Sequence, residues 1–298
     1  MDIRSLTQAC GFTDGHGYHP TLHPRVSLFG ANRHEASCPQ MYGAGMVFIL
    51  QGKKVGAAQG VQFETHKKRF LLMANSYPVT CETLATGDEP MLGLFVELDK
   101  AELARQLDIL AQTSATTPAT TEPRQTMLSV DLSKNIRVCL DELIKVLHTQ
   151  TETQILADGI LNRLLYEVLQ SEARPMLMAL GNHNHSLARI SKAMNYIEDH
   201  LSDKLSVDDL AEYLGMSPTA FYKRFKQAAG DTPLQYIKKM RLTKARTLMV
   251  YQQQSAIQAA LNVGYESPNQ FSREFKRFFG VPPSQARQLP YSELSGVV

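Results

Sequence analysis

The period of hydrophobic and polar positions changes part-way along the chain. Between residues 22 and 98, short apolar runs alternate with turn residues, as in Met46-Val47-Phe48-Ile49-Leu50 followed by Gln51-Gly52-Lys53-Lys54. Short runs rich in β-branched and aromatic residues, bounded by Gly, Asn and Pro, predict strands. Several such strands in succession predict a small antiparallel barrel or sandwich.

From about Asp131 the apolar residues recur with a helical period. Two stripes predict two amphipathic helices, the first with Leu140, Leu143, Ile144 and Leu147 and the second with Ile160, Leu161, Leu164, Leu165, Val168 and Leu169. Before them, residues 113–123 have little to bury and predict an exposed loop. After them, residues 171–185 form a candidate hinge, beyond which the pattern is helical to about residue 289.

These patterns predict an α+β protein of two domains. Residues 1–180 would form the first domain, β-rich over 22–98 and helical over 131–170. Residues 185–298 would form an all-α second domain. A chain of this length has enough residues for two ordinary domains, each with its own core.

The C-terminal third contains one segment twice. The first copy is AEYLGMSPTAFYKRFKQAAGDTP at residues 211–233, and the second is ALNVGYESPNQFSREFKRFFGVPP at residues 260–283. Gly215 matches Gly264, and seven further residues match at a spacing of 50: Ser217, Pro218, Phe221, Phe225, Lys226, Gly230 and Pro233 with Ser267, Pro268, Phe271, Phe275, Lys276, Gly280 and Pro283. A chance match of this order is improbable, so the repeat indicates two copies of one structural unit.

Each copy has the features of a helix-turn-helix unit. A glycine can close the first helix in the left-handed conformation, a serine can cap the next helix, and proline suits its first position. A helix, a tight turn and a second helix form the helix-turn-helix motif. Between the copies, residues 233–250 begin with Pro233 and contain no internal breaker, which predicts one long helix.

The second helix of each unit has an aromatic face and a polar face. Phe221 and Phe225 in the first copy, and Phe271, Phe275 and Phe278 in the second, are expected to point inward. The polar faces combine cationic and hydrogen-bonding groups, which suits a helix in the major groove of DNA. The residues that we expect to contact DNA are Pro218, Thr219, Tyr222, Lys223, Lys226, Asn269, Gln270, Ser272, Arg273 and Lys276.

The charge is distributed unevenly along the chain. The net charge is only +2. Residues 185–298 contain 15 Lys and Arg against 10 Asp and Glu, whereas the remainder contains 16 against 19. A basic C-terminal third is what a nucleic-acid surface requires.

Residues 187–289 closely resemble the AraC/XylS family of regulators. The residues that carry the resemblance are Leu210-Ala211, Ser217–Phe225, Arg241-Leu242, Ala245, Val263-Gly264-Tyr265-Glu266-Ser267, Ser272-Arg273-Glu274-Phe275-Lys276 and Phe279-Gly280-Val281-Pro282-Pro283. The resemblance implies a seven-helix domain that binds double-stranded DNA, and contact with RNA polymerase if the protein is an activator. The family often has arginine at the position of Lys223. Because lysine makes a point contact rather than a bidentate one, Lys223 could contact phosphate as readily as a base.

The N-terminal part resembles a domain found in a subset of these regulators. Phe48-Ile49-Leu50-Gln51-Gly52-Lys53-Lys54, Leu71–Pro78 and Leu92–Asp99 carry this looser likeness. It implies a cupin-like β-domain that acts as a sensor or dimerisation module, without identifying the ligand. We expect a small-molecule effector and a homodimer. Ile160, Leu164 and Val168 are slightly favoured as the dimer contact, although this stripe could equally pack on its own β-domain.

Candidate reactive or metal-binding residues in the first domain are few. The four cysteines form no Cys-x-x-Cys pair, so we expect them to be free thiols, with Cys81 as a candidate sensor of oxidants or electrophiles. His16, His19 and His23 lie close together but lack a cysteine or carboxylate at ligand spacing. His183 and His185 lack a third ligand nearby. We therefore predict no metal and no cofactor.

The sequence favours a sequence-specific transcription regulator that responds to a small molecule or a stress. The alternative is a constitutive DNA binder whose first domain only dimerises. An enzyme is a remote alternative, because the strands lack metal ligands and the chain lacks a Gly-x-Ser-x-Gly elbow. No transmembrane stretch or secretory signal is recognisable, so the expected location is the cytoplasm, with no membrane partner.

Overall fold

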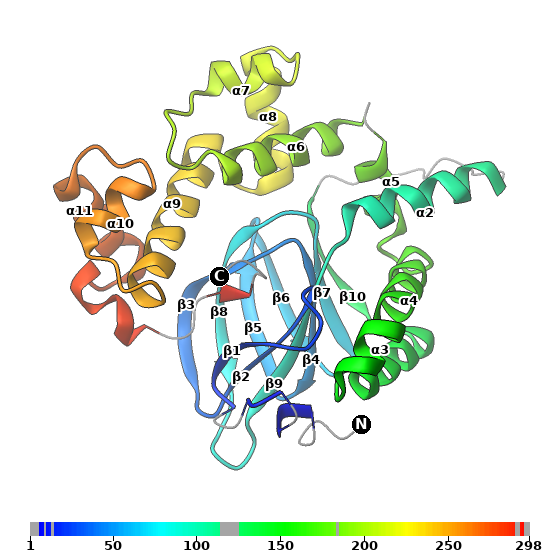
Figure 1. Ribbon diagram of the computed structural model, residues 1–298. Coiled ribbons are helices and arrows are strands. Elements are labelled where there is room, and N and C mark those ends of the chain that lie inside the picture. Colours follow the sequence, from blue (N-terminus) through cyan, green and yellow to red (C-terminus); the bar gives the residue numbers. More distant parts are fainter. Residues whose placement is uncertain are drawn as a thin grey trace.

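The computed structural model describes residues 6–8, 10–12, 15–113, 125–182, 185–289 and 293–294. A strongly coiled sheet, open on one side, occupies the centre of the molecule (Figure 1). Helices of the first half lie on one side of it, and the helices of the C-terminal third lie above it and along its opposite edge. The α+β class with a helical C-terminal domain is therefore confirmed.

The sheet is antiparallel apart from one short pairing at its edge. Its strands are β1 Gly17–Pro20, β2 Val26–Ala31, β3 Glu35–Tyr42, β4 Gly45–Gln51, β5 Lys53–Ala58, β6 Val61–His66, β7 Arg69–Met73, β8 Tyr77–Leu84, β9 Met91–Glu97, β10 Met127–Asp131 and β11 Glu293–Leu294. The order is β1-β2-β9-β4-β7-β6-β5-β8-β3-β11, with β10 paired to β7. Only β11 runs parallel to its neighbour, β3, among the described strands. Strands β1, β10 and β11 lie outside the predicted range of 22–98, and β11 belongs to the part of the chain that was predicted to be all-α.

The helices of the first half are α2 Lys100–Thr113, α3 Lys134–Val146, α4 Gln150–Leu169 and α5 Arg174–Gly181. Ser133 caps α3 by accepting a hydrogen bond from Ile136 N at 3.2 Å. The predicted stripe of α3 is buried, and Leu140 and Leu143 are at most 1% exposed. Helix α2 was not predicted, although Leu103, Leu107 and Leu110 recur at helical spacing and contact the core.

Two predictions for this region were wrong. The candidate hinge at residues 171–185 contains α5, whose Met176 and Leu177 are buried, because its apolar residues also follow a helical period. The favoured dimer stripe on α4 packs within its own chain, since Leu164 and Val168 are 0% exposed. The apolar side chains that α4 exposes are Ile155, Leu156 and Tyr166. Of the predicted loop 113–123, Thr113 ends α2 and the other residues lie outside the described part of the chain, as does His183.

The C-terminal helices are α6 Ser186–Asp199, α7 Val207–Tyr213, α8 Pro218–Ala229, α9 Pro233–Val250, α10 Ala256–Asn262 and α11 Pro268–Phe279. The seventh helical segment is the short 3₁₀ helix η1, Pro283–Gln288. The prediction of one helix over residues 233–250 is confirmed, because Pro233 begins α9 and Thr232 caps it.

Helix α9 also connects the C-terminal helices to the sheet, next to β3 (Figure 1). Tyr236 donates a hydrogen bond to the Ser76 carbonyl at 2.7 Å. Arg246, only 1% exposed, donates to the Pro39 carbonyl at 3.4 Å. From the barrel side, Asn75 donates to the Ser191 carbonyl of α6 at 3.1 Å. The two halves are therefore in direct polar contact.

Candidate nucleic-acid interface

The first unit consists of α7 and α8, joined by a tight turn. Ser217 caps α8 by accepting a hydrogen bond from Ala220 N at 3.3 Å. Pro218 occupies the first helical position, where its missing N–H leaves no bond unmade. Gly230 ends α8 with a φ of 71°, in the left-handed region that glycine adopts without strain. The predicted helix-turn-helix geometry of the first copy is confirmed.

The second unit, α10 and α11, reproduces the same local structure. Ser255 begins α10 with a capping box, and Ser267 caps α11 by accepting a hydrogen bond from Gln270 N at 3.3 Å. Gly264 in the turn and Gly280 at the end of α11 have φ values of 85° and 80°. The shared serine, proline and glycine have therefore produced the same capping pattern for α8 and α11.

An arginine from a neighbouring helix holds the turn of each unit. Arg189 on α6 donates to the carbonyls of Leu214 and Gly215. Arg241 on α9 donates to the Gly264 carbonyl at 3.2 Å and to the Leu201 carbonyl at 2.9 Å. Carbonyls at a helix end lack intrahelical partners, and a guanidinium offers several donors. These side chains hold each turn against the helix that precedes its unit, and Arg189 was not singled out from the sequence.

Four of the five aromatic side chains predicted to point inward are fully buried. Phe278 is only partly buried, and its neighbour Phe279, at 7% exposed, takes the inward position. Phe221, Phe225, Phe271 and Phe275 are all 0% exposed. Within each unit the two rings lie with centroids 5.5 Å apart. Burying such large side chains supplies most of the driving force for packing these short helices. The cores of the two units are thus built alike.

The polar faces of α8 and α11 are open to solvent. All of the predicted contact residues are exposed: Pro218, Thr219, Tyr222, Lys223, Lys226, Asn269, Gln270, Ser272, Arg273 and Lys276. Tyr222 is 44% exposed despite its aromatic ring. The structure therefore leaves both faces accessible, and contact with DNA remains a prediction for each residue.

A network at the start of α11 positions Gln270. Gln270 Nε2 donates to Glu274 Oε1 at 3.3 Å, and Glu274 also accepts hydrogen bonds from Lys238 Nζ and from the Tyr265 hydroxyl, each at 2.9 Å. Burial alone would raise the pKa of Glu274, but these hydrogen bonds hold it below its usual range. The charged Glu274 therefore joins α11 to α9 and orients the Gln270 amide.

Two exposed arginines were not predicted from the sequence as DNA-contact residues. Arg224 on α8 and Arg277 on α11 each directly follow a predicted contact residue. Each lies about 100° around the helix from that residue, at the border of the polar face. Basic residues at such a border can contact the phosphate backbone beside a groove. The sequence feature that could have identified them is the pair of adjacent basic residues in each helix, Lys223-Arg224 and Lys276-Arg277.

Two family models match the chain. A model described as the AraC-type transcriptional regulator N-terminus matches residues 23–176, which is more than half of the chain. A helix-turn-helix domain model matches residues 210–289, which include most of both units. The chain belongs to the AraC-type transcriptional regulators. The family that the sequence resembled is therefore confirmed.

Curated relatives of this AraC-type regulator match it over part of their length. The probable transcriptional regulator LumQ of Photobacterium leiognathi is 31% identical over 144 residues, which is 48% of this chain and 58% of LumQ. The transcriptional activator RhaS of Escherichia coli is 33% identical over 107 residues, which is 36% of this chain and 38% of RhaS. Each match therefore covers less than two thirds of the relative.

Solved structures of ToxT from Vibrio cholerae share the fold over nearly the whole chain. One superposes with a TM-score of 0.63 at 14% identity, covering 92% of this regulator and 99% of ToxT. An apo form of a ToxT point variant gives a TM-score of 0.61 at 13% identity, over 89% and 98% of the two chains. At this identity the likeness concerns the fold alone.

The candidate sensor thiol lies inside the barrel. Cys81 is 0% exposed, and its Sγ lies 3.5 Å from the Tyr42 hydroxyl. It is aligned with Cys38 across the β3–β8 pair. Burial raises the pKa of Cys38 to about 11, so its thiol is a weak nucleophile at neutral pH. A sensing role for Cys81 remains a prediction, which an unchanged peroxide response in Cys81→Ser would contradict.

The histidines near the start of the barrel have separate partners. His16 pairs with Glu35 at 3.8 Å, His19 contacts the Cys10 carbonyl, and His23 pairs with Asp158 at 3.3 Å. Within the described ranges, no group of three metal-ligating side chains is assembled. His185 caps α6 by accepting a hydrogen bond from Leu187 N. In those same ranges, no helix has the length and apolar character needed to cross a bilayer.

Proposed function

We propose that this AraC-type regulator binds double-stranded DNA with α8 and α11 and thereby controls transcription. The observation that carries the proposal is the pair of solvent-exposed polar helix faces on two matching helix-turn-helix units. Both faces combine lysine or arginine with amide or hydroxyl groups, which can contact phosphates and base edges. The basic C-terminal third supports the same function.

The two faces would have different tasks. Arg273 can form a bidentate pair with a guanine, and Asn269 can pair with an adenine in the major groove. Lys223 occupies the corresponding place in the first unit and would contact phosphate, because an ammonium is a point charge. We therefore propose that the second unit reads more of the sequence and that the first unit contributes more electrostatic affinity.

Helix α9 would set the spacing between the two units. Its 18 residues span about 27 Å at ~1.5 Å per residue. Successive major grooves on one face of a duplex lie roughly 34 Å apart. With one unit at each end of α9, a single chain could reach adjacent grooves, so its site would span about two helical turns.

The barrel would act as the sensor, and residues 1–180 and 185–298 would be the sensor and DNA-binding domains. Solved ToxT structures include one bound to an unsaturated fatty acid and one bound to a naphthalenyl butenoic acid. A small-molecule effector is therefore our proposal for this chain as well. Direct contacts between barrel and C-terminal helices, such as Asn75 to Ser191, favour coupling over a domain that only dimerises.

We further propose a cytoplasmic homodimer that, as an activator, contacts RNA polymerase. RhaS is named as an activator, which supports the last point. Ile155, Leu156 and Tyr166 of α4 are between 46% and 72% exposed and are the apolar residues available for a second copy. The named relatives are transcription regulators, and an enzymatic activity is not part of the proposal.

The decisive experiment is enrichment of genomic fragments on the purified full-length protein, followed by sequencing. A few strongly enriched sites, each spanning about two helical turns per chain, would support the proposal. A variant with Asn269 and Arg273 both changed to alanine should lose that enrichment, whereas Gln288→Ala, an exposed change in η1, should retain it. Equal enrichment by the double variant would refute the assignment of the polar face of α11.

A further inference from the structure

A lysine lies inside the half-barrel with no anionic partner in the part of the chain that the structure describes. Lys54 on β5 is 3% exposed. Its Nζ donates to Gln40 Oε1 at 3.0 Å and lies 5.5 Å and 5.4 Å from the ring centroids of Phe29 and Tyr42. Across the described ranges, no carboxylate lies within the 4.0 Å of an ion pair with this ammonium. A neutral amide and two ring faces offset only part of the cost of removing an ammonium from water.

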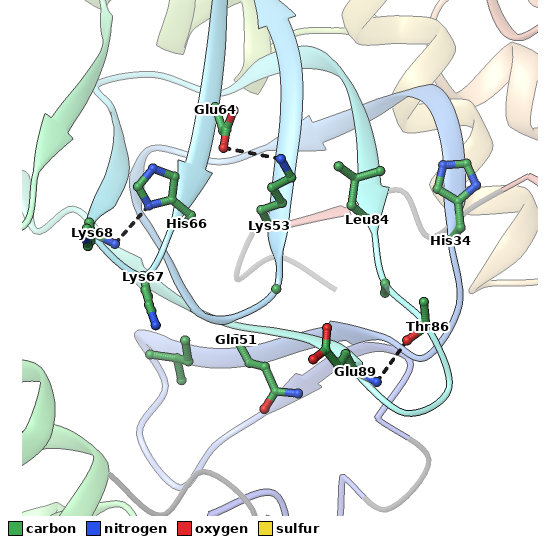
Figure 2. Close-up of a pocket in the computed structure, with 13 residues that line it drawn as sticks. His34, Gln51, Lys53, Glu64, His66, Lys67, Lys68, Leu84, Thr86 and Glu89 are labelled. Carbon is green, nitrogen blue, oxygen red and sulfur yellow. Dashed lines mark hydrogen bonds and ion pairs between the residues drawn. The ribbon is translucent and has the colours of Figure 1, made fainter.

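The preceding lysine shows the contrast. Lys53 is exposed and forms an ion pair with Glu64 at 3.6 Å (Figure 2). It lines a cleft of about 960 Å³ at the end of the barrel, together with His34, Leu84 and Ala85. Successive strand residues point to opposite faces of a sheet, so Lys53 faces outward and Lys54 faces the barrel interior.

Two further buried polar groups near Lys54 have hydrogen-bonding atoms without a partner. Thr83 is aligned with Lys54 across the β5–β8 pair and is 0% exposed, and its Oγ1 has no hydrogen-bond partner. Gln40 on β3 is 1% exposed, and its Nε2 also lacks a partner. Unpaired buried polar atoms are rare and destabilising. The ammonium, the amide and the hydroxyl can all donate hydrogen bonds, which makes their combination suited to an anion.

A buried carboxylate on the same face does not neutralise Lys54. Glu35 is aligned with Thr83 across the β3–β8 pair and is 5% exposed. Its ion pair is with His16, at 3.8 Å. No side chain in the described ranges therefore places a negative charge within ion-pair distance of Lys54.

We propose that Lys54, Gln40 and Thr83 bind the carboxylate of a small organic acid, with its apolar part against the aromatic rings of the barrel. This inference rests on the proposed sensor function and names the chemical class of the effector. A carboxylate accepts several hydrogen bonds and forms charge-assisted ones with an ammonium. Ala85, two residues beyond Thr83 in the chain, lines the end-of-barrel cleft, from which the acid would enter.

The site also has a direct route to the DNA-binding half. Gln40 follows Pro39 on β3, and the Pro39 carbonyl accepts the hydrogen bond from the buried Arg246 of α9. A carboxylate held by Gln40 therefore acts on the strand that α9 contacts. Its binding energy can then favour one placement of β3 relative to α9 over another.

The test is a thermal-shift titration of the full-length protein with sodium decanoate and sodium benzoate, one aliphatic and one aromatic acid. Decanol and benzamide are the uncharged controls. Wild type and Lys53→Met should be stabilised by at least one of the acids but by neither control. Lys54→Met should bind that acid about 10–100-fold more weakly, as expected for the loss of a hydrogen bond from a charged donor.

No stabilisation of the wild type by either acid would overturn the proposal, as would equal responses from Lys54→Met and Lys53→Met. If Lys54→Met fails to fold by circular dichroism, Thr83→Val and Gln40→Leu take its place and should each weaken the response. Gel-shift assays of the wild type on enriched genomic fragments distinguish a failure of the proposed DNA-binding function from a failure of the proposed acid site. Absence of DNA binding with an intact acid response would refute the proposed function alone.

Discussion

The two helix-turn-helix units share their local structure but differ in their surroundings. At Gly230, which ends α8, an added Cβ would lie 2.4 Å from the backbone of Gln59, in the turn between β5 and β6. At the equivalent Gly280, which ends α11, an added Cβ would have no described atom within 4 Å outside its own stretch of chain. The first unit is therefore in close contact with the barrel at a place where the second is open.

The second unit is joined to the barrel through its core and α9. Cys38 of β3 packs with the core of that unit, and the guanidinium of Arg246 lies 5.5 Å from the Phe279 ring centroid while donating to the Pro39 carbonyl. A change in the barrel can therefore act on the two units by different routes. The following predictions test that difference, beginning with the largest expected effect.

Removing one buried ring from each unit tests whether the core of that unit also stabilises its contact with the barrel. Phe225→Ala and Phe275→Ala should each lower the free energy of unfolding by about 3–5 kcal/mol, because each leaves a cavity. Phe225 also packs against Tyr236, with ring centroids 5.4 Å apart, and Tyr236 bonds to the barrel. Phe225→Ala, and not Phe275→Ala, should increase proteolysis where Tyr236 contacts the barrel at Ser76. Chemical denaturation and limited proteolysis measure the two effects, and equal proteolysis would contradict the difference.

Adding a methyl group at the two equivalent glycines isolates the barrel contact. Gly280→Ala should lower the free energy of unfolding by about 1–2 kcal/mol, the cost of a left-handed conformation for alanine. Gly230→Ala carries the same strain and also collides with Gln59, so its loss should be larger. Thermal unfolding gives the difference, and small-angle scattering should show that only Gly230→Ala changes the separation of barrel and helices. Matching results for the two variants would show that the contact at Gln59 is unimportant.

Two substitutions compare the proposed DNA contacts. Arg273→Ala should lose about 1–3 kcal/mol at one base position and relax specificity there. Lys223→Ala should weaken binding uniformly across sequences and reduce the salt slope by about 1. Fluorescence anisotropy with base-substituted duplexes at several salt concentrations distinguishes the two patterns. A uniform loss for Arg273→Ala would assign that residue to phosphate.

The smallest expected effect is a pH dependence at the contact between α6 and the barrel. Burial raises the pKa of Glu198 on α6, partly opposed by a hydrogen bond with Ser76 and by Lys100. Asp199 and Lys244 are the other charged groups nearby, the first raising and the second lowering this pKa. A carboxyl whose pKa is raised by folding stabilises the fold fully below its ordinary pKa, and this contribution is lost as the pH rises through the raised value.

Replacing the carboxyl by an amide should remove that dependence. As the pH rises from about 4.5 to about 7, the melting temperature of Glu198→Gln should change less than that of the wild type, because the variant has no carboxyl to ionise. Glu266→Gln changes an exposed carboxyl of the second unit and should keep the wild-type profile. A flat wild-type profile would show that Glu198 is not coupled to the contact with Ser76.

The sequence was most informative where structure depends on neighbours in the chain. The repeat identified both units because Ser217 and Ser267, Gly230 and Gly280, and the paired phenylalanines each define a local conformation. Helix α2 was missed although its leucines follow a helical period. The dimer stripe was wrong because a period shows which face of a helix is apolar, and not what covers that face.

The sequence by itself determined the two helix-turn-helix units, the long helix between them and the strand-rich first half, because caps, turns and periodicity are local properties. Only the tertiary structure placed Gly230 against Gln59, Arg246 beside Pro39, and Lys54 among Gln40, Thr83 and two aromatic rings. These contacts join residues from strands and helices that are distant in the chain. Their formation depends on sheet register and packing, for which no short sequence pattern provides a signal.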